Sequence, residues 1–234
     1  MIICIIQARM GSTRFPGKVM EKIDDENRVT DYVVNQIKSS KLIEKIIVAI
    51  PNLAEDDIFY QHLLSKKIST YRGSSNNVLD RYYQCAQNES GTVIVRITAD
   101  NPLVDPEVVD KTIKKFMENE YDYVGNIHPK TFPNGTEVEV FSFYALETAW
   151  KQTKDVYDLE HVTPYFSKNP DKFKLGNLSQ TKDESNYRWT VDYVEDLEFI
   201  KYVVNKIPNR PILINNIMNL IKNPHNFKIT KNYN

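Results

Sequence analysis

Residues 2–18 read IICIIQARMGSTRFPGK, and this stretch sets the expected fold. Its first part, Ile2–Ile6, is a short apolar run that is typical of a buried strand. The rest, Gln7–Lys18, is a loop with two glycines, one proline and three cations. Because such a loop buries no core of its own, its charges and bare amides are available to an anion. We expect that anion to be a triphosphate.

The loop has two sources of positive potential. Gly11 and Gly17 let backbone N–H groups approach an anion closely. Arg9, Arg14 and Lys18 add three charges, and the two arginines can each bind two phosphate oxygens at once. The simpler alternative is a basic surface turn that joins a strand to a helix.

Two common phosphate-binding motifs do not fit this loop. Val19 follows Lys18, whereas the P-loop requires serine or threonine at that position. The dinucleotide-binding fingerprint requires a third glycine in register, which the loop lacks. The ATPase and NAD-binding interpretations are therefore weakened.

The composition indicates a globular protein whose basic site is local. The chain has 234 residues, 41% of them hydrophobic. We expect a single domain over residues 1–234, with a loosely ordered tail after about residue 223, because no Pro/Gly/Ser-rich tract divides the chain. The formal net charge is −1, from 30 basic and 31 acidic residues. We therefore expect neither nucleic acid nor an anionic membrane as a partner.

The two cysteines and the apolar runs point to a cytoplasmic protein. Cys4 and Cys85 fit neither a disulfide framework nor a zinc site, so we expect both to be reduced core residues. The first apolar run stops after five residues at Gln7, which is too short for a signal peptide. No stretch of the chain approaches the length of a transmembrane helix.

Short β-rich runs alternate with helix-period segments along the chain, as in an α/β sandwich. Thr92–Ile97 has the strongest strand signal, and its apolar run predicts burial on both faces near the sheet centre, where Arg96 needs either a partner or an exit. Further strands are expected at Lys45–Ile50, Ile68–Tyr71, Tyr121–Gly125, Glu137–Phe143, Lys174–Leu178 and Tyr187–Val191. Helices are expected at Val29–Ser40, Ala54–Lys66, Asn76–Asn88, Asp105–Glu120, Ala145–Thr153, Leu159–Ser167, Glu195–Lys206 and Ile214–Lys222.

Polar residues follow three of the expected strands. One group is the loop after the first strand, a second contains Asp100 after Thr92–Ile97, and the third begins at Asp192 after Tyr187–Val191. Ligands of open α/β sheets bind beyond the carboxyl ends of the strands. Two carboxylates can therefore converge on one crevice, although each could instead cap a helix.

Six positions of the loop match a family signature. They are Ala8, Arg9, Ser12, Arg14, Pro16 and Lys18, in the pattern Ala-Arg-x-x-Ser-x-Arg-x-Pro-x-Lys. The chain thereby resembles the sugar cytidylyltransferases, which include CMP-KDO and CMP-sialic acid synthetases, and most closely the spore coat polysaccharide biosynthesis protein F branch. The resemblance spans Ile2 to about Ile200. It implies a three-layer α/β/α sandwich of the Rossmann-like, GT-A type, with a mixed, mostly parallel central sheet.

The resemblance also implies a metal and a nucleotide site. Asp100 and Asp192 match metal-binding aspartates in segments similar to Thr-Gly-Asp-x-Pro-Leu and Trp-Thr-Val-Asp, which implies a Mg²⁺ ion shared with the triphosphate. The implied catalytic residues are Arg9, Arg14, Lys18 and Asp100. The implied nucleotide contacts are Gln7, Ala8, Arg9, Gly11, Ser12, Lys18, Gly73, Ser74, Asp80, Arg81, Thr98 and Asp100. Asn77 stands where the family usually has an aspartate.

Later segments resemble the acceptor side of the family's site and its dimer-forming arm. The implied acceptor contacts are Asn134, Glu137, Glu139, Glu160 and His161. A lone histidine is more often structural, which is the alternative for His161. We also expect a homodimer, on an apolar cluster formed by Val162, Pro164, Tyr165 and Phe166. The alternative is that these residues face the core of the monomer.

Together these expectations describe a Mg²⁺-dependent nucleotidyltransferase. A sugar oxygen, from an ulosonic acid or a sugar phosphate, would attack the α-phosphorus of CTP and release pyrophosphate, mainly through positioning and charge neutralisation. Such a reaction would serve the biosynthesis of a surface polysaccharide. Two alternatives stay open: a GT-A-type glycosyltransferase, although the chain has no Asp-x-Asp triplet, and a nucleotide-binding subunit without catalysis. The chain departs from the family pattern at Asp24–Asn27, Ala99 and Asn101, and the acceptor stays unassigned.

Overall fold

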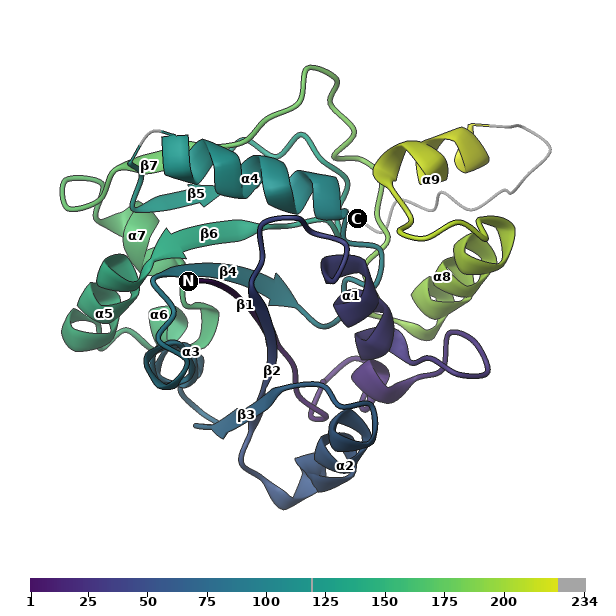
Figure 1. Cartoon of the computed structure of the whole chain (residues 1–234), viewed down its shortest axis with the longest axis horizontal. Coiled ribbons are helices and arrows are strands. Elements are labelled where there is room, and N and C mark those ends of the chain that lie inside the picture. Colours follow the sequence, from purple (N-terminus) through teal and green to yellow (C-terminus); the bar gives the residue numbers. More distant parts are fainter. Residues whose placement is uncertain (119, 223–234) are drawn as a thin grey trace.

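The computed structural model describes residues 1–118 and 120–222. These residues build a seven-stranded sheet in the order β3-β2-β1-β4-β6-β5-β7 (Figure 1). Its strands are β1 (Ile2–Gln7), β2 (Lys45–Pro51), β3 (Thr70–Gly73), β4 (Val93–Thr98), β5 (Tyr123–Gly125), β6 (Glu139–Ser142) and β7 (Leu175–Asn177). Among them β6 is antiparallel to both neighbours and the other pairs are parallel. The sheet is therefore mixed and mostly parallel, as predicted.

The strand β4 lies at the centre of the sheet, as its apolar run predicts. It pairs with β1 on one side and with β6 on the other. Ile94, Val95 and Ile97 are buried, so both of its faces are covered. Arg96 finds the expected partner in Glu139, which lies directly opposite on β6.

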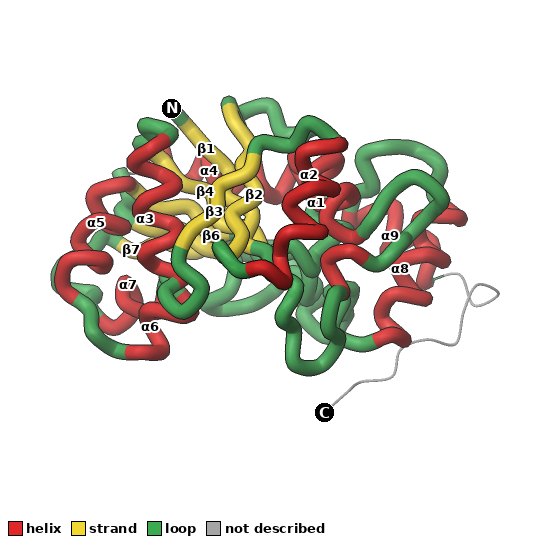
Figure 2. Tube along the Cα trace, turned by 90° about the horizontal axis from the view of Figure 1, so that it is seen from below, coloured by secondary structure: helices red, strands yellow, loops and turns green. Residues whose placement is uncertain are grey.

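Helices cover both faces of the sheet, which confirms the three-layer sandwich (Figures 1 and 2). Successive side chains of a strand point to opposite faces. Cys4 and Ile6 of β1 accordingly pack in one cluster and Ile3 and Ile5 in the other. The first cluster includes residues of α1 (Val29–Ile37), α2 (Asp57–Ser65), α4 (Pro106–Glu118), α8 (Val194–Lys206) and α9 (Ile214–Ile221). The second includes residues of α3 (Val78–Asn88) and α5 (Phe143–Gln152), and α6 (Val156–His161) and α7 (Pro164–Lys168) pack there too.

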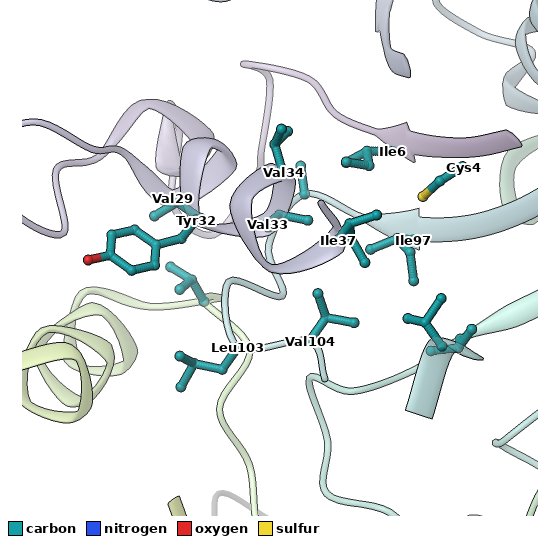
Figure 3. Close-up of a cluster of buried hydrophobic side chains, with 14 of the residues drawn as sticks. Cys4, Ile6, Val29, Tyr32, Val33, Val34, Ile37, Ile97, Leu103 and Val104 are labelled. Atoms are coloured by element: carbon teal, nitrogen blue, oxygen red, sulfur yellow. The ribbon is translucent and has the colours of Figure 1, made fainter. Parts of the chain in front are cut away.

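The helix α1 shows how the sequence pattern produces this packing. Val33, Val34 and Ile37 lie on one stripe because they are three to four residues apart. They point toward Ile6 and Ile97 of the two central strands (Figure 3). The predicted inward face of this helix is therefore confirmed. Both cysteines are buried and free, as expected.

The segment Tyr187–Val191 is not a strand, so that prediction was wrong. Arg188 forms an isolated parallel bridge with Asn134. The backbone N–H of Asn134 donates to Tyr187 O at 2.8 Å, and that of Trp189 donates to Asn134 O at 2.9 Å. The segment pairs with the loop before β6 and not with the sheet. Its apolar alternation reflects the burial of Trp189 and Val191 in the core.

The segment expected as one helix over Leu159–Ser167 is divided into α6 and α7. Val162 lies between them with φ 71° and ψ −59°, and the N–H of Thr163 donates to His161 O at 2.8 Å. This geometry is that of a γ-turn with a positive central φ. Pro164 then opens α7, where a proline N atom suits the first helical turn.

The apolar cluster expected at a dimer interface lies in the chain's own core. Val162, Tyr165 and Phe166 are buried, and they pack with Phe141 and Tyr123 of the sheet. These three side chains are therefore already covered within the monomer, and only Pro164 of the cluster is partly exposed. The tail expected after residue 223 lies outside the described residues. None of the described helices combines the length and the apolar character needed to span a membrane.

Candidate active site

A cavity of about 350 Å³ lies at the carboxyl ends of β1 and β4. Its walls come from the loop after β1, the segment after β4, the end of α6 and the residue after the Tyr187–Val191 segment. The sequence-predicted residues that line it are Gln7, Ala8, Arg9, Ser12, Arg14, Lys18, Thr98, Asp100, Glu160, His161 and Asp192. Segments far apart in the chain thus meet where the parallel-sheet argument places a ligand.

The loop after β1 is fixed by a buried carboxylate that the sequence did not single out. Asp56 is fully buried, and its Oδ1 accepts the backbone N–H of Met10 at 2.8 Å. The N–H groups of Ser12 and Gly17 both donate to Met10 O, at 2.8 and 2.9 Å. Gly17 has a φ of 75°, which glycine adopts without strain. Burial raises the pKa of Asp56, and the hydrogen bond from Met10 opposes that shift.

Lys18 joins this loop to both predicted carboxylates. Its Nζ lies 2.7 Å from Asp100 Oδ2, 3.0 Å from Asp192 Oδ1 and 2.8 Å from Val191 O. An ammonium group has three donors, so all of them are used. The side chain of Lys18 is only 10% exposed. The two carboxylates therefore converge on one point, where a cation of the chain holds them together.

Asp192 has two further cationic partners. Arg14 donates to its Oδ1 at 2.7 Å, and Arg188 donates to its Oδ2 at 2.7 Å. Burial alone would raise the pKa of the Asp192 carboxyl, but the hydrogen bond and charge of Lys18, the charge of Arg14 and the hydrogen bond from Arg188 outweigh burial and lower it. Arg188 is itself held by Asp196. Neither Arg188 nor Asp196 was predicted, because no motif marks them.

The donor set of the site fits a Mg²⁺ ion that is held jointly with phosphate. Within residues 1–118 and 120–222, no group of three or more His, Cys, Asp and Glu side chains could hold a metal ion by itself. Mg²⁺ is commonly bound through one or two carboxylates, substrate phosphates and waters. Asp100 and Asp192 supply the two carboxylates, next to a loop whose cations suit phosphate.

Five of the residues expected to contact the nucleotide do not line the cavity. Gly11, Gly73, Ser74, Asp80 and Arg81 are not among its lining residues, although Val78, one turn before Arg81, is. Arg81 is only 1% exposed and donates to Ser74 O at 2.8 Å. Burial lowers its pKa. Among the described residues, no carboxylate lies within ion-pair distance of Arg81, so its charge is buried without a close counter-ion.

Gly73 and Asp80 have clear structural roles beside Arg81. A Cβ atom on Gly73 would lie 2.7 Å from Tyr71 Cε1 and 3.0 Å from Arg81 Cγ, so glycine permits the close approach of both side chains. Asp80 Oδ1 accepts the indole N–H of Trp150 at 2.9 Å. Asn77, which replaces the usual aspartate, caps α3 through a hydrogen bond from Asp80 N at 2.8 Å. The substitution thus keeps the helix start intact.

Three of the residues expected at the acceptor do not line the cavity. Asn134 and Glu137 are occupied by Lys130, and Glu137 also accepts the N–H of Gly135 at 2.9 Å. Glu139 is 3% exposed, forms an ion pair with Arg96 and accepts the Tyr123 hydroxyl at 2.8 Å. The carboxylate of Glu139 therefore holds Arg96 in place.

That residue, Arg96, lines the cavity and was not predicted to do so. Besides its ion pair with Glu139, its Nη2 donates to Gln7 Oε1 at 3.3 Å. The need for a buried partner was the signal in the sequence that could have identified it. The other lining residues that were missed are Thr13, Val19, Val78 and Ala99.

Glu160 and His161 form the wall opposite the loop. Glu160 lies 3.9 Å from Arg9 across the cavity, and both side chains are about half exposed. His161 packs against the ring of Tyr157, with the ring centroids 4.3 Å apart. It directly precedes the γ-turn at Val162, which fixes the direction in which the chain leaves the cavity.

Residues 3–217 match a family model described as cytidylyltransferase. An uncharacterised protein of Methanocaldococcus jannaschii is 40% identical over 199 residues, which are 84% of this chain and 80% of that protein. The spore coat polysaccharide biosynthesis protein SpsF of Bacillus subtilis is 32% identical over 222 residues, 90% and 89% of the two chains. The 3-deoxy-manno-octulosonate cytidylyltransferase of Geobacter sulfurreducens is 27% identical over 193 residues, 79% and 68% of the two chains.

Solved structures show the same relationship. A cytidylyltransferase from Leptospira borgpetersenii has a TM-score of 0.91 and 30% sequence identity, and the match covers 100% of this chain and 99% of that one. A CMP:2-keto-3-deoxy-manno-octonic acid synthetase complexed with CTP has a TM-score of 0.65 at 11% identity, covering 88% and 98%. The second likeness shows the fold alone.

Proposed function

Because the chain belongs to the cytidylyltransferase family, we propose that it transfers CMP from CTP to a sugar acceptor and releases pyrophosphate, in the biosynthesis of a surface polysaccharide. The observation that carries this proposal is the convergence of the loop after β1 with Asp100 and Asp192 around Lys18. Nucleotidyl transfer requires positive charge for the triphosphate next to carboxylates for a metal, and both occur at one end of one cavity.

In this proposal the loop after β1 binds the triphosphate and the two carboxylates bind the metal. Arg9 and Arg14, whose side chains are 50% and 56% exposed, bind phosphate oxygens, together with backbone N–H groups of the loop. Asp100 and Asp192 hold Mg²⁺, which when bound neutralises phosphate charge and helps to orient the α-phosphorus. The loop and the sheet supply the fixed geometry, so catalysis is mainly positioning.

The nucleoside and the acceptor bind on different sides of this centre. We assign the nucleoside to the side of Gly73, Ser74 and Arg81, because Val78, one turn before Arg81 on α3, lines the cavity there and the buried guanidinium has no close carboxylate. We assign the acceptor to the side of Glu160 and His161. Asn134, Glu137 and Glu139 support that side from behind, with Arg96 as the group that reaches the cavity.

The acceptor class follows from the relatives and from the cations of the site. An ulosonic acid or a sugar phosphate carries a negative charge, which Arg96 and the loop cations favour. One relative is named for transfer to 3-deoxy-manno-octulosonate, and another for spore coat polysaccharide biosynthesis. We accordingly place the enzyme in the cytoplasm, where CTP is supplied.

We also retain the proposal of a homodimer, on a different surface. Tyr144 of α5 and Val156 and Tyr157 of α6 are 63%, 76% and 56% exposed, and they offer apolar area at the surface. Light scattering at micromolar concentration tests this proposal. A mass of 27.3 kDa alone would contradict it.

The reaction is tested by incubating the protein with each of the four NTPs, Mg²⁺ and a panel of ulosonic acids and sugar phosphates, and measuring pyrophosphate. We expect release only with CTP and an acidic acceptor. The variants Asp100→Asn and Asp192→Asn and the double variant should all lose turnover. The double variant should be little worse than the worse single one, because one metal depends on both carboxylates. Absence of pyrophosphate with every combination would favour a binding subunit without catalysis.

A further inference from the structure

The Asp100–Asp192 pair has no unused carboxylate oxygen. Asp100 Oδ1 accepts the Thr98 hydroxyl at 2.6 Å, and Oδ2 accepts Lys18 at 2.7 Å. Asp192 Oδ1 accepts Lys18 and Arg14, and Oδ2 accepts Arg188. Of these donors, Lys18 alone bonds both carboxylates. Its ammonium thus takes the position that a divalent cation shared by the two carboxylates would need.

Lys18 and such a cation are therefore competitors. Oxygen atoms that already accept from an ammonium cannot also ligate a second cation at the same point without like-charge repulsion. A cation that arrives alone must displace Lys18 from both carboxylates, and Lys18 would then lose both of its charged partners while it is only 10% exposed. An unpaired cation in such a place is costly, so this displacement is unfavourable.

A triphosphate changes this balance. Lys18 itself lines the cavity, so phosphate oxygens bound there lie within reach of its flexible four-carbon stem. The ammonium can exchange carboxylate oxygens for phosphate oxygens, which are equally good partners. The number of ion pairs is then conserved, because the carboxylates receive the metal as the lysine leaves.

We propose that Lys18 is a built-in competitor of the divalent cation, which excludes the metal from Asp100 and Asp192 until a triphosphate draws the ammonium away. Metal and nucleotide then enter the site together, and the metal does not bind before the nucleotide. Lys18 thereby sets the order of binding. This inference takes Asp100 and Asp192 as the metal ligands and so rests on the function proposed above.

The test measures Mn²⁺ binding to the protein without nucleotide, by electron paramagnetic resonance of free Mn²⁺. Relative to the wild type, Lys18→Met should bind Mn²⁺ at least about ten-fold more tightly, a change typical of coupling between two sites. Lys18→Arg keeps the charge and should stay as weak as the wild type. The matched control is Lys130→Met, since Lys130 also pairs with a carboxylate, Glu137, but does not line the cavity.

A double variant locates the metal. Adding Asp100→Asn to Lys18→Met should abolish the gained affinity, because one of the two ligands is then lost. Equal Mn²⁺ affinity of the wild type and Lys18→Met would overturn the proposal, and so would a gain that persists in the double variant. Circular dichroism checks each fold, and Lys18→Gln, whose amide can still donate to Val191 O, replaces the methionine variant where that one does not fold. No nucleotide is present, so failure of the pyrophosphate assay does not affect this result.

Discussion

Arg81 combines almost complete burial with a charge that has no close carboxylate. Burial lowers its pKa, which expresses the cost of keeping it charged. Replacing a buried charge by an apolar side chain is often neutral or stabilising. Among the described residues the Nε of Arg81 has no hydrogen-bond partner, and a nucleotide group bound on that side, as proposed above, would supply one.

We predict that Arg81→Met weakens CTP binding without destabilising the fold. Loss of one charged hydrogen bond should raise the KM for CTP about ten-fold or more. Thermal unfolding should occur at the same temperature as in the wild type or higher, since a buried charge is removed. The control is Arg72→Met, because neither arginine lines the cavity but Arg72, unlike Arg81, has a carboxylate partner in Asp57. An unchanged KM would reject the nucleoside assignment.

Asp192 should make the stability of the protein depend on acid pH. Its folded pKa is lowered, so it binds fewer protons than in the unfolded chain. Its contribution is fully present above the ordinary carboxyl pKa of about 3.9 and is lost as the pH falls through the lower folded value. The stability difference between wild type and Asp192→Asn should therefore shrink as the pH falls below about 4. Urea unfolding at several pH values measures it, and a constant difference would contradict the expectation.

At the scale of elements, Gly135 decides where the segment before Asp192 lies. It has a φ of 98°, and a Cβ atom would lie 2.7 Å from Thr190 N and 2.8 Å from Trp189 C. We predict that Gly135→Ala destabilises the protein by roughly 1–3 kcal/mol, because both the backbone angle and the contact become strained. Gly11→Ala is the control, since its Cβ would approach only the end of the Glu55 side chain. Equal denaturation midpoints of the two variants would refute this view.

The γ-turn after α6 predicts that a glycine variant at Val162 is more stable than the alanine variant. In a helix or strand, glycine lowers the stability of the protein by about 0.5–1 kcal/mol relative to alanine. A residue other than glycine that is held at a positive φ costs of order 1–3 kcal/mol. Val162 has such a φ, so Val162→Gly removes strain that Val162→Ala keeps. Both variants lose a similar buried side chain. We therefore expect Val162→Gly to be the more stable of the two in urea unfolding, and the reverse order would mean that the turn is unstrained.

At the scale of the whole molecule, the sequence predicted those parts of the fold and of the site that depend on short stretches of the chain. The apolar run of β1, its loop and the central place of β4 all follow from short stretches. The prediction of a strand at Tyr187–Val191 was wrong because alternating apolar and polar residues indicate which side chains are buried, but not which part of the chain covers them. Asp56, Arg188 and Asp196 were missed for a related reason. Their roles depend on contacts across the fold, which no spacing along the chain records.

The position of β6 has a consequence for the order of folding. The parallel set β3-β2-β1-β4 is complete once residue 98 has been synthesised, but the strand that covers the other edge of β4 begins only at Glu139. A nascent chain therefore exposes the edge of β4 while the following segment is made, and such edges recruit other chains. A fragment of residues 1–118 should accordingly aggregate, and one of residues 1–152, which adds β6 and α5, should do so less. Equal solubility of the two fragments would show that α4 alone protects the growing sheet.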